Sequence, residues 1–388
     1  AQRTYAGNSL MLENALSWTR MMTLMKRPSL LMLSFLLERL FKIPAIRREQ
    51  WKTLPLASMD KHVIGERVHF WQDWMQHSSA SDPWWAPMSH RQSIAMIKRP
   101  ITMVAGWHDI FLPWQLQDFI ALRAANGETR ITIGPWSHTD MRLVRAGWHD
   151  AIDWFNRHLL GKNTPTQKPI KLYVIGANAW REFDTWPPQD SQVENWYLQP
   201  QRQLRDCIAP DSESDQYRYD PDDPTPSLGG PNLFSGNATV DNAELEARAD
   251  VLTYTSEPLT QYKDIIGPVA AEIYATSSAD SADFFVRLCD VDESGISQNI
   301  CDGLQRVTIQ ANKAPQRVRI ELWPTAYRIE RGHRLRVQIS SGAFPRWARN
   351  AGTTEPIAQQ TELHAATQAI FHSPKYPSAI TLSIFDNH

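Results

Sequence analysis

The sequence predicts a protein of mixed α/β and all-β class, with a helical part, a partial parallel sheet and an all-β sandwich. Three observations indicate this. Apolar residues recur at helical spacing before about residue 92, β-rich runs alternate with helical segments from 92 to about 195, and helical periodicity almost vanishes from 196 onward. A chain of 388 residues is also too long for one ordinary core.

The first part, residues 1–91, reads as mostly helical. Apolar residues repeat every three or four positions at 10–25, 29–41 and 65–77, and Pro28 and Pro44 punctuate the first two runs. The most apolar run, "SLLMLSFLLERLF" (29–41), is too short to cross a bilayer and contains charged residues. We therefore expect it to form a buried or interfacial helix.

The second part, residues 92–195, predicts right-handed β-α-β units in a parallel sheet. Its apolar runs are bounded by Pro and Gly, which suits strands that are buried on both faces. The expected elements are a strand at 100–109, a helix at 112–127, a strand at 129–138, a helix at 146–161 and a strand at 170–187. Two or three such units are too few for a free-standing sheet, so the pattern indicates half of one.

The last part, residues 196–388, consists of short β-rich segments separated by clusters of Pro, Gly, Asp and Ser. This spacing is typical of an all-β sandwich of jelly-roll type. Two of the three cysteines, Cys289 and Cys301, lie almost symmetrically about the turn-like "DESG". A hairpin could bring them together, but two small buried thiols are the simpler interpretation.

The charge balance argues against nucleic acid as a partner. There are 40 Lys and Arg against 42 Asp and Glu, and no basic block stands out. Neutralisation of phosphates needs clustered cations. No run predicts a membrane span, and "AQRTYAGNSLML" at the start is no signal peptide. The compartment stays open: the cytoplasm is slightly favoured, and export of a longer precursor is an alternative.

Two residues form the candidate catalytic site. Asp109 follows one predicted strand and His138 follows the next, with a helix of suitable length between the strands. At the carboxyl ends of neighbouring parallel strands, a carboxylate can accept the imidazole Nδ1–H and stabilise the imidazolium that forms when a serine proton is taken. No G-x-S-x-G occurs in the sequence, and Ser9 and Ser137 lack the context of a nucleophile.

The sequence motifs around these residues resemble those of a known family. "AGWHDIF", "IGPWSHT", "WFNRHLLG", "YDPDDPTPSLGG" and "GHRLRVQISSGAFPRWARN" occur in that order. Together they are similar to the CocE/NonD hydrolases, which include cocaine-esterase-like enzymes, α-amino-acid ester hydrolases, glutaryl acylases and Xaa-Pro dipeptidyl-peptidases. The resemblance implies a helical cap at 1–91, the C-terminal half of an α/β-hydrolase core at 92–195 and a jelly roll at 196–388.

The same resemblance implies residue roles. The acid and the histidine of the family motif fall on Asp109 and His138, and Trp18 and Phe111 match aromatic positions of the acyl pocket. Plain packing explains either ring equally well. The family's serine precedes the cap, so we expect it in an N-terminal half that is absent from these 388 residues, supplied in cis or by a second chain. Asp82 resembles an acidic cap motif, although a loop-capping role explains it as well.

The expected function is hydrolysis of an ester or amide acyl bond through an acyl-serine intermediate. The substrate would be a small-molecule ester, amide or peptide, with no metal and no organic cofactor. His149, Asp153 and His158 share a helix, but only the first two share a face, so a solvated helix surface is the better interpretation. Oligomeric state stays open, homo-oligomers included. The alternative function is non-catalytic binding of a carbohydrate or a partner protein by the jelly roll.

Overall fold

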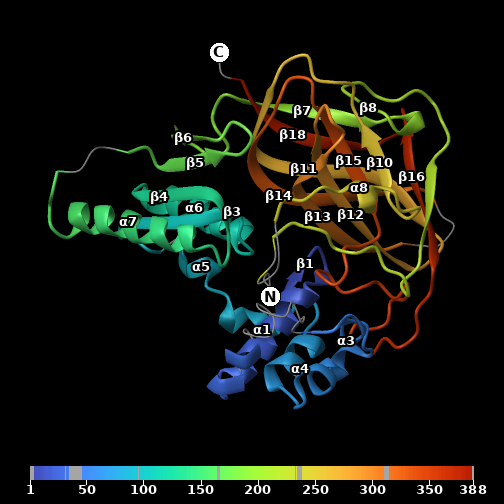
Figure 1. The fold of residues 1–388 in the computed structure, drawn as a ribbon, viewed down its shortest axis with the longest axis horizontal. Coiled ribbons are helices and arrows are strands. Elements are labelled where there is room, and N and C mark those ends of the chain that lie inside the picture. Colours follow the sequence, from blue (N-terminus) through green and yellow to red (C-terminus); the bar gives the residue numbers. More distant parts are fainter. Residues whose placement is uncertain are drawn as a thin grey trace.

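The computed structural model describes residues 4–30, 32–34, 46–94, 96–163, 167–231, 233, 238–309 and 314–386. Figure 1 shows three regions: helices in blue, a small sheet with two helices in green, and a large all-β part in yellow to red. Most of the helix that the sequence predicts at 29–41 lies outside the described residues. Within the described part, no helix is long and apolar enough to cross a membrane.

The helical region begins with a small hairpin and continues through short helices. In order these are β1 (Tyr5–Ala6), β2 (Ser9–Leu10), α1 (Leu12–Leu24), α3 (Arg48–Trp51), 3-10 turn Leu56–Ser58, π-helical turn Asp60–Ile64, α4 (His69–Gln76), 3-10 turn Pro83–Met88 and α5 (Arg91–Ile94). Leu16, Met59 and Trp71 are fully buried in its core. That core also takes in Phe344 and Ala348, so the helices rest on the all-β part.

The central sheet has the order β3-β4-β5-β6. Its elements are β3 (Ile101–His108), α6 (Leu112–Asn126), β4 (Thr129–Ser137), α7 (Met141–His158), β5 (Ile170–Val174) and β6 (Ala179–Phe183). β3, β4 and β5 are parallel, as the sequence predicts. The single strand expected at 170–187 is wrong, because β5 and β6 form an antiparallel hairpin. The chain reverses at Gly176 and Asn178, which both have positive φ.

The helices α6 and α7 cover opposite faces of this sheet. Ala105 and Ile131 are fully buried and share a core with Phe119 of α6. On the other face, Thr102 of β3 donates a hydrogen bond to Asp150 of α7. Because neighbouring residues of a strand point to opposite faces, odd-numbered side chains of β3 and β4 face α6 and even-numbered ones face α7.

The all-β part contains two antiparallel sheets with a common buried core. One sheet has the order β10-β15-β12-β13: β10 (Leu252–Thr255), β15 (Arg334–Ser340), β12 (Ser281–Val291), β13 (Ser297–Thr308). The larger sheet has the order β17-β16-β11-β18-β7-β8, with β14 beside β11 and β9 beside β16. Its strands are β17 (Tyr376–Pro377), β16 (Ala366–Ser373), β11 (Lys263–Ser277), β18 (Ala379–Phe385), β7 (Ser191–Leu198), β8 (Leu204–Arg205), β14 (Gln316–Ile329) and β9 (Asp215–Tyr219).

Two details bear on the sequence predictions. The expected boundary between residues 195 and 196 falls inside β7, which pairs with β18 in the larger all-β sheet. Cys289 and Cys301 lie on the neighbouring strands β12 and β13, and both are buried free thiols.

The central sheet is joined to the all-β part through main-chain bonds. The Ile175 N–H donates to Ala326 O at 3.0 Å, and the Arg328 N–H donates to Ile175 O at 2.7 Å. Arg181 of β6 forms a 2.8 Å ion pair with Asp264 of β11, whose side chain is fully buried. These contacts fix the carboxyl ends of β3 and β4, where Asp109 and His138 lie, relative to the rest of the molecule.

Candidate functional site

Asp109 lies in the turn that follows β3. Its N–H donates to Gly106 O at 3.0 Å, and its carboxylate accepts the Phe111 N–H at 2.9 Å. A side chain at Gly106 would collide with the Trp136 carbonyl, so the glycine allows β3 and β4 to approach closely here. The Asp109 side chain is almost fully buried, and its hydrogen bond with the Phe111 N–H holds it in place independently of His138.

His138 follows β4 and faces Asp109. Its Nδ1 lies 3.2 and 3.3 Å from the two carboxylate oxygens of Asp109. The ring of Phe111 meets the imidazole edge-on, with centroids 4.8 Å apart at 90°. The imidazole is 30% exposed, and no described residue forms a hydrogen bond with Nε2. The two residues that the sequence singled out are therefore brought together in a common site.

This arrangement suits an imidazole that acts as a base. A carboxylate on Nδ1 stabilises the tautomer with the proton on Nδ1, which leaves the Nε2 lone pair free. It also favours the imidazolium once Nε2 has taken a proton. The Nδ1–carboxylate distances are at the long end of the hydrogen-bonding range, as is common in catalytic pairs without a substrate.

Neither serine considered from the sequence contacts this base. Ser137 immediately precedes His138 and pairs in register with His108. Ser9 lies in β2, and its buried hydroxyl has no hydrogen-bond partner in the described part of the chain. No described hydroxyl lies within hydrogen-bonding distance of His138 Nε2, so a nucleophile is not part of the described site.

A second contact of Ser, His and Asp, which sequence reasoning missed, lies in the all-β part. Ser212 Oγ is 2.9 Å from His372 Nδ1, and His372 Nε2 is 3.0 Å from Asp215. In His372 the carboxylate lies on Nε2 and the hydroxyl on Nδ1, whereas in His138 the carboxylate lies on Nδ1. The His372 side chain is only 2% exposed, and Ser212 Oγ also lies 2.9 Å from His372 O. These features are those of a structural tie between a loop and β16.

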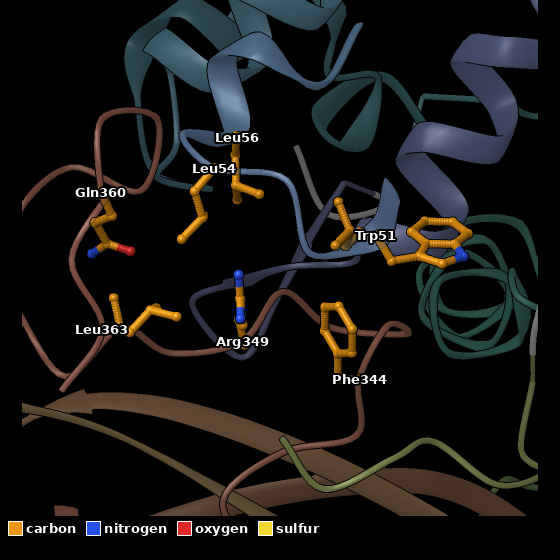
Figure 2. A pocket seen from close by; sticks show the side chains of 9 residues that line it. Trp51, Leu54, Leu56, Phe344, Arg349, Gln360 and Leu363 are labelled. Carbon is orange, nitrogen blue, oxygen red and sulfur yellow. The ribbon is translucent and has the colours of Figure 1, made fainter. Parts of the chain in front are cut away.

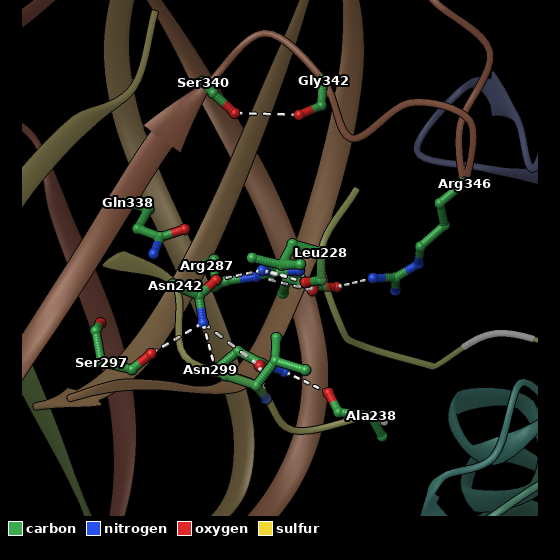
Figure 3. A network of polar contacts seen from close by, with 12 residues as sticks. Leu228, Ala238, Asn242, Arg287, Ser297, Asn299, Gln338, Ser340, Gly342 and Arg346 are labelled. Carbon is green, nitrogen blue, oxygen red and sulfur yellow. Dashed lines mark hydrogen bonds and ion pairs between the residues drawn. The ribbon is translucent and has the colours of Figure 1, made fainter. Parts of the chain in front are cut away.

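His108, next to Asp109, is a further residue that the sequence did not identify. Burial lowers the pKa of its imidazole to about 4, and the charge of Asp302 acts in the opposite direction. Asp302 forms ion pairs with Arg287 and Arg346, two arginines of the buried polar network in the all-β part that Figure 3 shows. It accepts from Arg287 Nη2 at 2.9 Å and pairs with Arg346 Nη1 at 2.7 Å. Both arginines hold the pKa of Asp302 below its usual range against the opposing effect of burial.

The remaining candidates occupy different positions. Phe111 contacts His138 through the edge-on ring pair. Trp18 lies on α1 and is 43% exposed, and no contact between it and Asp109 or His138 is found in the described part. Asp82 caps the turn at Pro83–Met88 by accepting the Trp84 N–H at 2.8 Å, and it also bonds His77. The capping role of Asp82 is thereby confirmed.

Two cavities lie elsewhere, between the helices and the all-β part. One has room for about 10 Å³, roughly a single water, and lies between Leu54 and Leu56 on one side and Phe344 and Leu363 on the other (Figure 2). The other is an open polar groove of about 500 Å³ that Tyr5 and other residues line. Neither cavity is lined by Asp109 or His138.

Comparison with protein families gives two matches that together cover most of the chain. The profile described as X-Pro dipeptidyl-peptidase C-terminal non-catalytic domain matches residues 163–381. The profile described as X-Pro dipeptidyl-peptidase (S15 family) matches residues 2–140. The second match contains both Asp109 and His138.

Individual relatives agree with these matches. The cocaine esterase of Rhodococcus sp. (strain MB1 Bresler) is 30% identical over 369 residues, covering 85% of this chain and 64% of the esterase. A putative serine esterase of Mycobacterium bovis is 25% identical over 337 residues, covering 72% of this chain and 51% of that protein. This chain therefore spans less than two thirds of the length of these curated relatives.

Solved structures show the same fold. An aminopeptidase from a marine sediment archaeon, Thaumarchaeota archaeon, gives a TM-score of 0.80 at 21% identity, over 88% of this chain and 64% of that one. An α-amino acid ester hydrolase gives 0.79 at 22% identity, over 88% of this chain and 66% of that one. At this identity the likeness concerns the fold alone.

Proposed function

The chain belongs to the X-Pro dipeptidyl-peptidase (S15) family of CocE/NonD-type hydrolases, and we propose that it supplies the acid and the base of a serine hydrolase. The reaction is hydrolysis of an ester or amide acyl bond. The observation that carries the proposal is the contact of His138 Nδ1 with the buried Asp109 carboxylate at 3.2 Å, with Nε2 unoccupied. The nucleophilic serine comes from a segment outside these 388 residues.

In this mechanism His138 moves protons and Asp109 orients it. As the serine Oγ attacks the acyl carbon, Nε2 takes the hydroxyl proton, and the Asp109 carboxylate stabilises the imidazolium. The imidazolium then gives this proton to the leaving alcohol or amine as the acyl bond breaks. A water molecule repeats the sequence on the acyl-serine, which releases the acid and restores the serine.

The other parts of the protein have supporting roles in this proposal. Residues 1–91 form the cap and carry Trp18, which with Phe111 lines the acyl pocket. Residues 92–195 form half of the hydrolase core, and 196–388 form a jelly roll that braces it through β14. The substrate is a small ester, amide or peptide, and the reaction uses no metal and no organic cofactor. Non-catalytic binding is less well supported, because it leaves the Asp109–His138 contact without a purpose.

Turnover by the complete enzyme, meaning this chain together with the segment that carries the serine, tests the proposal. His138→Ala is compared with His149→Ala, a control on the exposed surface of α7, using a chromogenic acyl ester and an aminoacyl anilide. His138→Ala should abolish turnover of whichever substrate is cleaved, while His149→Ala should retain it. Retained turnover in His138→Ala would contradict the assignment.

A further inference from the structure

A buried guanidinium in the all-β part is only partly paired. Arg346 lies in the loop between β15 and β16, and its side chain is 1% exposed. Nη1 forms a 2.7 Å ion pair with Asp302, whereas Nε and Nη2 have no hydrogen-bond partner in the described part of the chain. Buried polar groups of folded proteins nearly always have a partner, and a buried cation without one is costly. Nε and Nη2 therefore require an acceptor that the described residues do not supply.

The charges around Arg346 favour an anion as this acceptor. Arg287 and Arg346 approach the carboxylate of Asp302 from opposite sides (Figure 3), and all three side chains are almost fully buried. Two cations and one anion leave an excess positive charge, which a partner of opposite sign would stabilise. The charge of Glu13 also acts on Arg346, but in the described structure Glu13 forms no hydrogen bond with the guanidinium. His108 adds no charge near pH 7, because its lowered pKa keeps the imidazole neutral.

The unpaired edge of the guanidinium has the shape that recognises a carboxylate. Nε and Nη2 lie side by side and point two parallel N–H groups outward, which match the two oxygens of a carboxylate. The Nη1 side is closed by Asp302 and by Gly230, where a Cβ atom would lie 2.5 Å from Nη1. The Arg346 Cζ lies 4.3 Å from the ring centroid of Trp347, whose Nε1–H is also buried and without a described partner. These contacts fix the orientation of the guanidinium before a ligand binds.

Arg346 lies where the three regions of the molecule meet. The Glu13 N–H of α1 donates to the oxygen of Pro345, the residue before Arg346, at 3.0 Å. On the all-β side, the ring of Trp323 in β14 lies 5.6 Å from the Arg346 Cζ. Trp114 of α6 meets Trp323 edge-on, with centroids 6.4 Å apart, and so brings the central sheet to the same place. Small ligands bind preferentially at such boundaries between parts of a protein.

We propose that Arg346 anchors a carboxylate-binding site at the junction of the three regions. The ligand is a small carboxylate, which Nε and Nη2 hold through two charge-assisted hydrogen bonds. This chemistry has two sources, a free carboxylic acid and a substrate that carries a carboxylate in addition to the bond that is cleaved. The second source is included because the charge of Asp302 acts on His108, the residue before Asp109. The site itself goes beyond the proposed function and does not depend on it.

Binding of trifluoroacetate to the complete enzyme is the first test, measured by fluorine nuclear magnetic resonance. The signal should broaden with the protein and sharpen again when acetate competes, whereas chloride at the same ionic strength should not displace the probe. Arg346→Lys keeps a cation for Asp302 but loses the bidentate edge, so the Kd for trifluoroacetate should rise about tenfold. Arg349→Lys is the matched control in the same loop. It should leave the Kd unchanged, because Nη1 and Nη2 of Arg349 already donate to carbonyl oxygens.

Three outcomes would overturn the proposal. They are no broadening with the wild-type protein, equal displacement by acetate and chloride, and a Kd that Arg346→Lys and Arg349→Lys change alike. Circular dichroism of each variant reports whether it folds. The competition between acetate and chloride uses the wild-type protein, so it decides the question even if Arg346→Lys does not fold.

Turnover distinguishes the two sources of the carboxylate. The monoester para-nitrophenyl succinate carries a carboxylate, and para-nitrophenyl butyrate lacks one. If the substrate supplies the carboxylate, Arg346→Lys should raise KM for the acidic ester about tenfold and leave KM for the neutral ester unchanged. Unchanged KM for both esters, together with weaker trifluoroacetate binding, would identify a free acid as the ligand. An equal rise for both esters would contradict carboxylate recognition, and cleavage of neither ester would count against the proposed function while the binding test stands.

Discussion

The all-β part and the central sheet of this protein differ in how completely they bury their apolar residues. The all-β part leaves single large side chains such as Val193 and Ile296 exposed, and every residue of β12 is buried. In the described part of the chain, the central sheet leaves an apolar stripe on helix α7 uncovered, with Trp148 67% exposed, and no described strand pairs with the outer side of β3. Isolated exposed apolar residues are ordinary in folded proteins, whereas a contiguous stripe marks a surface that another element covers. The candidate catalytic pair, Asp109 and His138, lies in the central sheet, which is the region with the uncovered apolar surface.

The same contrast holds for the two His–Asp contacts. In the all-β part, His372 is almost completely buried and both of its ring nitrogens have partners. In the central sheet, His138 has a partner among the described residues on Nδ1 only, and it is 30% exposed. A histidine whose two nitrogens are occupied holds structure together, whereas one with a free, accessible Nε2 can exchange protons with a substrate. Local environment therefore separates the two contacts, although their residue types are identical.

The largest effect is expected at the candidate catalytic pair, Asp109 and His138. Asp109→Asn should lower kcat of the complete enzyme by about 10⁴, because the amide favours the wrong tautomer of His138. Its fold should be intact, since an amide oxygen can still accept the Phe111 N–H. Steady-state kinetics and circular dichroism of the variant measure both quantities. The corresponding change in the all-β part, Asp215→Asn, should leave kcat within a few-fold of wild type.

The next effect concerns stability of the all-β part. Asp302→Asn should lower the free energy of unfolding by about 3–5 kcal/mol, because it leaves Arg287 and Arg346 buried without their shared anion. Urea unfolding measures the change. A matched control is Asp292→Asn in an exposed turn of the same part, which should cost less than about 1 kcal/mol. Equal losses in the two variants would mean that the buried network does not stabilise this part.

A smaller effect is expected on the pH dependence of stability, through His108 at the end of β3. His108 has its pKa lowered from 6.5 to about 4, so the unfolded chain binds a proton at pH values where the folded chain does not. Stability should therefore be complete above about pH 6.5 and decrease as the pH falls toward 4. His108→Gln should remove about 1–2 kcal/mol of this decrease, a value reduced for partial exposure of the ring. Urea unfolding at pH 7.5 and pH 5 measures it, and an unchanged pH dependence would contradict the burial of His108.

The smallest effect is expected on the exposed apolar stripe of α7, the helix face that carries Trp148 and Ile152, in the chain alone. Trp148→Ser should change the free energy of unfolding by less than about 0.5 kcal/mol, because the indole contacts solvent rather than the core. The fully buried Trp71 in the helical region provides the contrast, since Trp71→Ser should cost at least about 3 kcal/mol. A large loss for Trp148→Ser in the isolated chain would show that the stripe is covered within this chain.

The sequence predicted local features well and tertiary ones unevenly. The end of helix α6 at its C-cap Gly127 was predicted, because helical periodicity and a C-cap depend on nearby residues. The contact between Asp109 and His138 was predicted from the order of the two strands that precede them. The hairpin at Gly176 was missed because apolar β-rich residues on both sides of the turn read as one strand. The lowered pKa of His108 was not foreseen, since it depends on how the folded chain surrounds the ring rather than on the neighbouring residues in the sequence. The exposure of the apolar side chains of α7 was not foreseen either, because it depends on what packs against the helix in the fold.

The most direct measurement is intact-mass spectrometry of the complete protein after treatment with a fluorophosphonate probe. We expect a single adduct, on a serine outside these 388 residues, that is lost in His138→Ala and kept in Ser212→Ala. An adduct on this chain, or labelling that does not depend on His138, would contradict the claim that Asp109 and His138 activate a serine from another segment.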